Sequence, residues 1–177
     1  MPRPYFCKKR QVSEIIRVDH AGEYGAIRIY QGQIAATKDE SYKSLFQEML
    51  SHEQKHLDYF AEEIGKSHSR PTILLPFWHV LGYMMGYISA AAGVKTAMLC
   101  TEAVEEVIDE HYKNQQPILS DIGMDKLAEQ IEQHRQDELN HKNIAIKHGS
   151  TEAPMYLALK IIISKLCNFA IFSSKIL

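Results

Sequence analysis

The sequence carries the same short motif of potential metal ligands twice. Glu53 and His56 form one Glu-x-x-His motif, and Glu138 and His141 form another. Residues three apart on a helix share one face, so each motif directs a carboxylate and an imidazole to one point. A mixed oxygen and nitrogen ligand set favours iron or manganese over metals that prefer thiolates. The sequence therefore predicts a metal site built from at least two helices.

An additional glutamate precedes each motif. Glu23 lies 30 residues before Glu53, and Glu105 lies 33 residues before Glu138. At 100° per residue, apolar side chains surround each of these four carboxylates on its predicted helix, so we expect all four to be buried. A buried carboxylate without compensation is unfavourable and demands a partner, a proton or a metal.

The spacing also brings the two halves of the pattern to one height. In an antiparallel helix hairpin, two residues are level when they are equidistant from the turn. The midpoint of the first glutamate pair falls within residues 37–40 and that of the second within 117–123, and both ranges are predicted turns. Four carboxylates balance two divalent cations, and this arrangement is the pattern of di-iron and di-manganese carboxylate bundles. The predicted ligands are Glu23, Glu53, His56, Glu105, Glu138 and His141.

The choice of Glu105 leaves alternatives open, because Glu102 and Glu106 lie within about 60° and 100° of it around the same helix. Tyr112 shares the face of Glu105. Together with His111 it is a candidate to gate substrate or to assist electron transfer. An ordinary core tyrosine beside an exposed histidine is equally compatible with the sequence.

Three further polar residues are candidates to orient the ligands, namely Asp19, His20 and His134. For His20, a position on the helix surface fits the sequence slightly better. We expect His52 and His68 to be solvated.

Helical periodicity dominates the chain, and no alternating pattern of useful length predicts a strand. We predict helices over 13–37, 41–65, 74–92, 94–116, 124–148 and 154–173. Ser13 is the expected cap of the first helix and Ser41 or Asp39 that of the second, with stops at Gly65, Gly93 and Gly149. The prediction is an all-α, four-helix bundle with two additional amphipathic or hydrophobic helices. It forms one domain over residues 1–177, with an N-terminal arm at 1–12.

Composition excludes several other classes of protein. The chain has 177 residues, 45% of them hydrophobic and 24% charged, which is typical of one globular domain and not of a disordered chain. The net charge of −2 gives no basic field for nucleic acid. The three cysteines form no Cys-x-x-Cys pair, which excludes a cysteine-built metal site. No glycine-rich phosphate loop predicts a nucleotide-binding domain.

Two segments are unusually apolar. Residues 71–94 contain no Asp, Glu, Lys or Arg, and residues 154–177 combine isoleucine and phenylalanine with lysine. Proline and glycine interrupt the first segment and the second has a basic amphipathic pattern, so we expect both to lie on a membrane without crossing it. The alternative is that both are core helices or helices that contact another copy of the chain in a homo-oligomer. Gly82-x-x-x-Gly86 is a weak match to a helix-packing motif.

Several runs of residues resemble the demethoxyubiquinone hydroxylase family. They are Asp-His-Ala-Gly-Glu-Tyr-Gly-Ala at 19–26, Ala-Val-Glu-Glu at 103–106, His-Tyr-Lys-Asn-Gln at 111–115 and Asp-Glu-Leu-Asn-His at 137–141. The resemblance covers nearly the whole chain. It implies a ferritin-like di-iron monooxygenase of ubiquinone biosynthesis, which uses dioxygen to hydroxylate the ring of a polyprenyl demethoxyquinol. The six ligands that it implies are the six reached from spacing.

The resemblance also implies an electron donor, a location and partners. Family members take electrons from NADH, with His111 and Tyr112 in the relay. They are peripheral proteins of the inner membrane, on the cytoplasmic face in bacteria or the matrix face in mitochondria. Other ubiquinone-biosynthesis proteins are candidate partners there. The basic N-terminus is followed by no apolar run, so we expect no secretory signal. We expect the chain to be either bacterial or separated from a presequence.

Two other functions would use a similar bundle. An iron-storage or peroxide-handling protein of the ferritin or rubrerythrin type uses the same six ligands but needs no membrane-seeking helices. A membrane adaptor with a vestigial site binds no iron. Iron content and fractionation with membranes distinguish the three.

Overall fold

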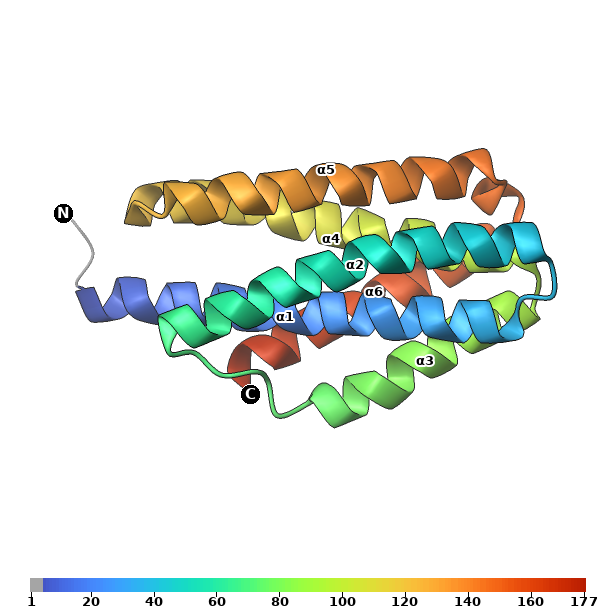
Figure 1. Ribbon diagram of the computed structural model, residues 1–177. Helices are drawn as coiled ribbons and strands as arrows, with labels where there is room; N and C mark the ends of the chain where they lie inside the picture. Colours follow the sequence, from blue (N-terminus) through green and yellow to red (C-terminus); the bar gives the residue numbers. More distant parts are fainter. Residues whose placement is uncertain (1–4) are drawn as a thin grey trace.

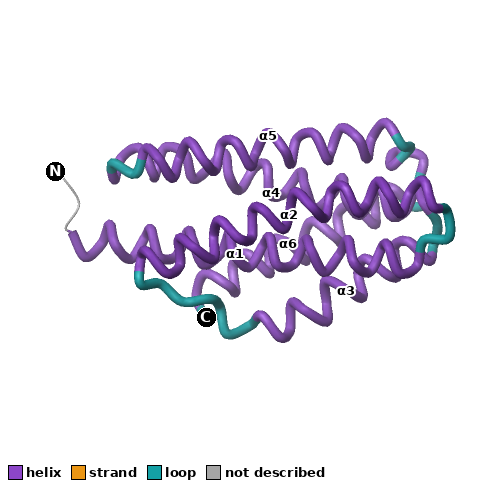
Figure 2. The backbone as a smooth tube through the Cα atoms, viewed as in Figure 1, coloured by secondary structure: helices purple, strands orange, loops and turns teal. Residues whose placement is uncertain are grey.

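The computed structural model describes the backbone of residues 5–177 and the side chains of residues 8–177. Within this range the protein is helical and contains no strand (Figures 1 and 2), which confirms the all-α prediction. The helices are α1 (Tyr5–Ala36), α2 (Glu40–Ser67), α3 (Leu75–Ala91), α4 (Val94–Ile122), α5 (Asp125–Lys147) and α6 (Tyr156–Ile176). A short 3-10 helix, η1 (Ser150–Glu152), lies between α5 and α6.

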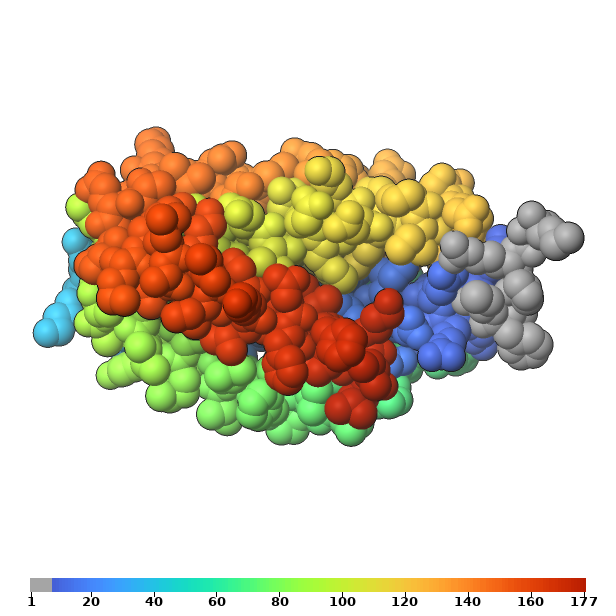
Figure 3. All heavy atoms as spheres, turned by 180° about the vertical axis from the view of Figure 1, so that it is seen from behind, coloured from blue at the N-terminus to red at the C-terminus, as the bar shows by residue number. Residues whose placement is uncertain are grey.

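Four helices form the bundle, and two cover one side of it. α1 and α2 form one antiparallel hairpin, and α4 and α5 form a second (Figure 1). α3 runs back along α1 from the end of α2 towards the start of α4. In the view from behind, α6 lies across the surface (Figure 3), where it contacts α4 and α1. This is the predicted ferritin-like core with two additional helices.

The start of α1 differs from the prediction. The helix begins at Tyr5, so Ser13 lies inside it and is not its cap. The Ser13 hydroxyl instead lies 2.6 Å from that of Ser69, which follows α2. The predicted arm over 1–12 is therefore helical from residue 5 onwards, and its first four residues lie outside the described range.

The ends of α2 are set by two different residue types. Asp39 accepts a hydrogen bond from the backbone N–H of Ser41 at 2.9 Å, so Asp39 and not Ser41 is the cap. The predicted stop at Gly65 is wrong, because the helix continues to Ser67. It ends at His68, which adopts the left-handed conformation that closes many helices, with φ 50°.

α4 is longer than predicted. It passes through Pro117 and continues to Ile122, so the predicted turn over 117–123 is wrong except at Gly123, which has φ 75°. Pro117 is exposed, whereas Leu119 and Ile122 are buried in the core. The burial of these apolar side chains stabilises the last turns, which the missing N–H of proline weakens.

α3 packs closely on α1 because glycines line the contact. A Cβ atom at Gly82 would lie 2.9 Å from the carbonyl oxygen of Gly25, and one at Gly86 would overlap the carbonyl oxygen of Ile29. The Gly82-x-x-x-Gly86 match is therefore a packing motif within the chain. α3 ends before Gly93, which has φ 117° and separates it from α4, as predicted.

The outer faces of α3 and α6 expose large apolar side chains. They include Phe77, Val80, Met84 and Ile88 of α3 and Leu157, Ile161, Phe169 and Phe172 of α6. Within the described residues, α6 is the one helix long and apolar enough to cross a membrane, and 11% of its most apolar stretch is buried. Core packing therefore does not account for these faces, while contact with a membrane and contact with another chain both stay open.

Candidate metal centre

The six predicted ligands converge in the interior of the bundle from four helices. Each of them is at most 3% exposed. α1 supplies one glutamate and α4 another, and α2 and α5 each supply a glutamate with a histidine one turn later. The residues are Glu23, Glu53, His56, Glu105, Glu138 and His141.

The atoms of these six residues form two overlapping groups, and Glu23 and His56 also form a third group with His134. In each group, one nitrogen or oxygen atom per residue lies within 4.8 Å of the others. The first group is Glu23, Glu53, His56 and Glu138, and the second is Glu53, Glu105, Glu138 and His141. Glu53 and Glu138 belong to both groups, so the geometry suits two cations with two shared carboxylates between them.

Both histidines turn the same ring nitrogen towards the carboxylates. Nδ1 of His56 lies 3.1 Å from Glu138 Oε1 and 3.6 Å from Glu23 Oε2. Nδ1 of His141 lies 3.0 Å from Glu53 Oε1 and 3.5 Å from Glu138 Oε2. Nδ1 is therefore the atom that each histidine presents for coordination.

The shared carboxylates are the strongest indication of a missing partner. Among the described residues, no hydrogen bond reaches either oxygen of Glu53, either oxygen of Glu138, or Nδ1 of His56 or His141. Buried polar atoms are rarely left without a partner, since desolvation then remains uncompensated. Six such atoms around one point, from oxygen and imidazole donors, fit a pair of divalent ions such as iron or manganese.

Two tyrosines hold the two glutamates that are not shared. The Tyr112 hydroxyl donates to Glu23 Oε1, and the Tyr30 hydroxyl donates to Glu105 Oε1 at 2.6 Å. Each tyrosine lies seven residues after one of these glutamates and contacts the other one. Sequence analysis missed Tyr30 in this role, although Glu-x6-Tyr occurs once in each half of the ligand pattern.

The pKa values of the cluster depend on burial and on the charges of the neighbouring carboxylates and imidazoles. Burial, together with the neighbouring carboxylates, raises the pKa of Glu53 and of Glu105. Burial also opposes ionisation of Glu138, yet the imidazoles of His141 and His56 keep its pKa below the ordinary value. Burial would lower the pKa of His56, but Glu138 and Glu23 raise it to about 11. Metal binding here must therefore displace protons.

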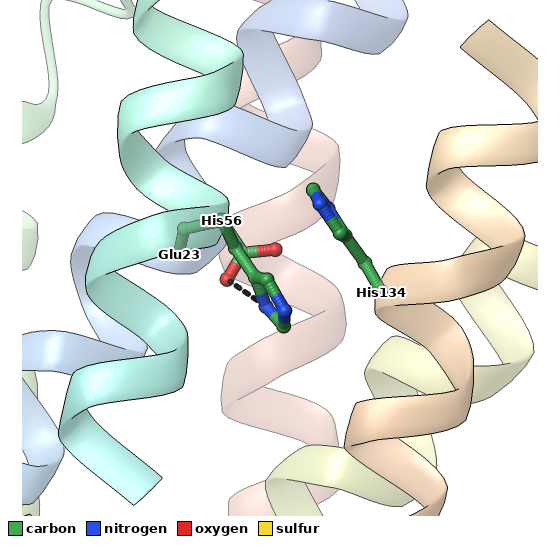
Figure 4. Close-up of side chains that lie close together, drawn as sticks. All are labelled: Glu23, His56 and His134. Carbon is green, nitrogen blue, oxygen red and sulfur yellow. Dashed lines mark ion pairs between the residues drawn. The ribbon is translucent and has the colours of Figure 1, made fainter. Parts of the chain in front are cut away.

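A second histidine lies against each ligand histidine. His134 stacks on His56 with ring centroids 4.0 Å apart (Figure 4), and burial lowers the pKa of His134 to about 4. His52 stacks on His141 at 5.3 Å, and its Nδ1 lies 3.1 Å from His141 Nε2. The prediction that His52 is solvated is therefore wrong, because the ring is half-buried against a ligand. His68 is exposed, as predicted.

The remaining polar candidates lie next to the cluster. Asp19 is buried and accepts a hydrogen bond from Gln115 Nε2 at 2.6 Å, and Nε2 of His111 lies 3.3 Å from the same oxygen. The rings of His111 and Tyr112 are 6.2 Å apart. His20 is 9% exposed, so its expected place on the helix surface is wrong.

The two alternatives to Glu105 point away from the cluster. Glu102 accepts hydrogen bonds from Ser150, from Tyr156 at 2.6 Å and from Lys160 at 2.7 Å. Glu106 is exposed and lies 2.9 Å from the same lysine. Both glutamates therefore attach α6 to α4, and Glu105 is the member of the trio that faces the other ligands.

An apolar cavity of about 80 Å³ lies on the other side of α1 and α4. Its walls come from α1, α3, α4 and α6, and they include Gly22, Gly25, Leu81, Val104, Ile108 and Ala170. Gly22 immediately precedes Glu23, and Val104 immediately precedes Glu105. The cavity therefore ends against the helix turns that carry two of the predicted ligands.

A glutamate from each of two helices and Glu-x-x-His from each of the other two define the class of ferritin-like carboxylate bundles. The profile of the family described as "Ubiquinone biosynthesis protein COQ7" matches residues 10–174. The chain therefore belongs to this family.

Three relatives illustrate the similarity. The "NADPH-dependent 3-demethoxyubiquinone 3-hydroxylase, mitochondrial" of Dictyostelium discoideum is 47% identical over 151 residues, covering 84% of this chain and 70% of the relative. The human protein of the same name is 44% identical over 167 residues, covering 93% and 77%. The "3-demethoxyubiquinol 3-hydroxylase" of Rhodospirillum rubrum is 39% identical over 165 residues, covering 93% and 77%. Two of these names specify NADPH, whereas the resemblance led us to expect NADH.

Proposed function

We propose that this chain is a di-iron monooxygenase that hydroxylates the ring of a polyprenyl demethoxyubiquinol, a late step of ubiquinone biosynthesis. The observation that carries the proposal is the set of six buried ligand atoms without hydrogen-bond partners, two from each shared glutamate and one from each histidine. The names of the relatives supply the substrate and the reaction.

The residues of the cluster have separate roles in this proposal. Glu53 and Glu138 would help to hold both metals, and His56 and His141 would each hold one through Nδ1. When bound, a pair of iron ions supplies the redox chemistry that activates dioxygen for insertion of one oxygen atom into an electron-rich ring. The protein holds the geometry and excludes water, since every ligand is buried in the bundle.

The apolar cavity is the proposed site of the quinol ring. Its volume of about 80 Å³ is smaller than the ~150 Å³ of a cavity that accepts benzene. A substituted ring therefore requires the surrounding helices to separate. We propose that α3 and α6 are the helices that shift, because α1 and α4 carry the candidate ligands. Their exposed apolar faces suit entry of a prenylated molecule from a membrane.

The attachment of α6 favours a peripheral position over a membrane-spanning one. Lys160 binds Glu102 at 2.7 Å near one end of α6, and the indole N–H of Trp78 donates to the Ser174 hydroxyl at 3.0 Å near the other. A helix attached to α4 near one end and to α3 near the other lies along the protein surface. We therefore propose that the α3–α6 face rests on the membrane and that the whole chain forms one domain.

The relatives support the rest of the proposal. Several carry "NADPH-dependent" and "mitochondrial" in their names. We propose NADPH as the electron donor, with His111 and Tyr112 as relay candidates near Asp19. The proposed location is the inner membrane, on its matrix face in mitochondria or its cytoplasmic face in bacteria, where other ubiquinone-biosynthesis proteins are the natural partners.

A single-turnover experiment tests the function. The chain is loaded with Fe(II) without oxygen, mixed with a short-chain demethoxyubiquinol, and exposed to ¹⁸O₂. We expect about two irons per chain and a product with one ¹⁸O atom in the new hydroxyl group. Two bound irons without hydroxylated product would overturn the enzyme assignment, and hundreds of irons per assembly would indicate storage.

Two variants make the experiment specific. Glu138→Ala removes a shared ligand and is expected to abolish metal binding and product together. Glu48→Ala changes an exposed glutamate on α2 and is expected to leave both unchanged. Full iron binding by Glu138→Ala would contradict the proposed ligand set.

A further inference from the structure

The residue that precedes each Glu-x-x-His motif contacts the histidine of the opposite motif. His52 precedes Glu53 on α2, and its Nδ1 lies 3.1 Å from Nε2 of His141 on α5. Asp137 precedes Glu138 on α5, and its Oδ2 lies 3.1 Å from Nε2 of His56 on α2. The two contacts are equivalent in position, in distance and in the ring nitrogen that they reach. They differ in chemistry, because one partner is an imidazole and the other is a carboxylate.

The orientation of the ligand rings fixes which atom donates. His56 and His141 both direct Nδ1 at the carboxylates of the cluster. A metal on Nδ1 leaves the ring proton on Nε2, and this N–H then donates outwards. Asp137 accepts it with a carboxylate oxygen, and His52 accepts it with the lone pair of a neutral ring. A carboxylate that accepts from a ligand histidine increases the basicity of that ligand, whereas a neutral acceptor mainly orients it.

The rest of the two coordination sets is closely matched. Each metal position shares Glu53 and Glu138, and each has one further glutamate held by a tyrosine. Tyr112 holds that glutamate in one position and Tyr30 holds it in the other. Apart from His134, which also lies within ligand distance of Glu23 and His56, the contrast between the two halves lies in the outer partner of the histidine.

We infer that the two metal positions are chemically unequal, and that Asp137 and His52 are the positioning residues that make them so. The position with His56 binds its metal more tightly and makes it more electron-rich, while the position with His141 binds the weaker metal. This inference rests on the proposed metal centre and specifies how the protein distinguishes its two halves. Asp137 lies at the surface, with 54% of its side chain exposed, whereas His52 is half-buried.

Calorimetric titration of the metal-free chain with Mn(II), without oxygen and at fixed pH, tests the inference. We expect two resolved steps in the unaltered chain. Asp137→Asn keeps an acceptor but removes the charge, and it is expected to weaken the tighter step by about 10- to 100-fold. His52→Asp is expected to tighten the weaker step by a similar factor, so that the two constants approach each other. Mössbauer spectra of the chain loaded with two equivalents of ⁵⁷Fe(II) are expected to contain two distinct doublets, which His52→Asp makes more alike.

Three further variants separate positioning from a general structural effect. His52→Gln retains a neutral acceptor and is expected to keep both constants, whereas His52→Leu removes the acceptor and weakens the second step. His68→Asp makes the same change of charge at an exposed residue that follows α2 and is expected to change neither constant. Circular dichroism checks that each variant stays helical.

Three results would overturn the inference: one binding constant with one doublet in the unaltered chain, constants unchanged in both Asp137→Asn and His52→Asp, or no metal binding at all. The inference and the proposed function fail separately. Two unequal metals without quinol hydroxylation would leave the inference standing and remove the function. Hydroxylation by a chain with two equal metals would do the reverse.

Discussion

The Glu53→Gln variant is expected to be more stable than the unaltered chain without metal and less stable than it with metal. Glu53 is 1% exposed, and neither of its oxygens has a hydrogen-bond partner among the described residues. Its pKa is raised by burial and by three neighbouring carboxylates. Such a group destabilises the folded state once it ionises. The contribution of Glu53 to metal-free stability is therefore most favourable below the ordinary pKa near 4.5 and is lost as pH rises through the folded-state pKa.

The magnitude follows from removing a buried carboxylate whose oxygens have no hydrogen-bond partner among the described residues. At pH 8 the metal-free Glu53→Gln variant is expected to gain about 2 kcal/mol, within the range of ~1–3 kcal/mol for a buried polar group without a partner. For a chain of this length, 2 kcal/mol corresponds to about 4–8 °C in melting temperature. Free metal at about a hundred times Kd adds about 2.7 kcal/mol per site to the unaltered chain. The variant lacks a carboxylate that both sites share, so the metal is expected to stabilise it by less than about half as much as the unaltered chain.

Thermal unfolding followed by circular dichroism, with a chelator and then with Mn(II), measures both terms. The expected result is that the variant melts above the unaltered chain without metal and below it with metal. Glu48→Gln, an exposed change on the same helix, is expected to follow the unaltered chain in both conditions. A metal-free variant that melts lower at pH 8, or equal gains from metal in both chains, would refute the reasoning.

Two further predictions concern the outer helices. Ala170→Phe fills the apolar cavity from α6 and is expected to reduce hydroxylation at least tenfold with unchanged metal content. Ala158→Phe, at an exposed position of the same helix, is expected to retain activity. Product assays combined with metal analysis test both expectations. Burial opposes ionisation of Glu102, but the hydrogen bonds from Lys160, Ser150 and Tyr156 hold its pKa below the ordinary 4.5. Its stabilisation is therefore present above pH 4.5 and lost as pH falls through the lower folded-state pKa. Glu102→Gln is expected to lose about 1–3 kcal/mol at pH 7 and progressively less below pH 4.5 in denaturant titrations; a loss independent of pH would contradict this ion pair.

The convergence of the six candidate ligands was predictable because it depends on local periodicity. Each Glu-x-x-His motif places two ligands on one helix face, and the distance of each glutamate from its turn places the ligands level. Both relations hold whatever the residues between them are. In the second hairpin α4 continues past Pro117 and the chain turns at Gly123, just beyond the predicted midpoint, and Glu105 still meets the cluster.

The outer partners were not predictable from one helix at a time. His52 lies next to a ligand in sequence, and its side chain contacts the opposite hairpin. Whether it is solvated depends on how α2 and α5 are packed, and the periodicity of α2 alone does not contain that information. The same holds for Glu102, whose direction is decided by Lys160 and Tyr156 on α6, more than fifty residues away in sequence.

The arrangement of α1 and α4 connects the metal chemistry with the choice of substrate. Adjacent residues on a helix point about 100° apart. Glu23 therefore faces the cluster while Gly22 lines the cavity, and Glu105 and Val104 divide in the same way. Each helix presents a ligand on one face and a wall of the cavity on the next, so a ring in the cavity lies one helix thickness or less from the ligands. If the cavity holds the ring as proposed, changes in α3 or α6 would alter which molecule enters without disturbing the candidate ligands. Changes in α2 or α5 would alter metal binding without reshaping the cavity.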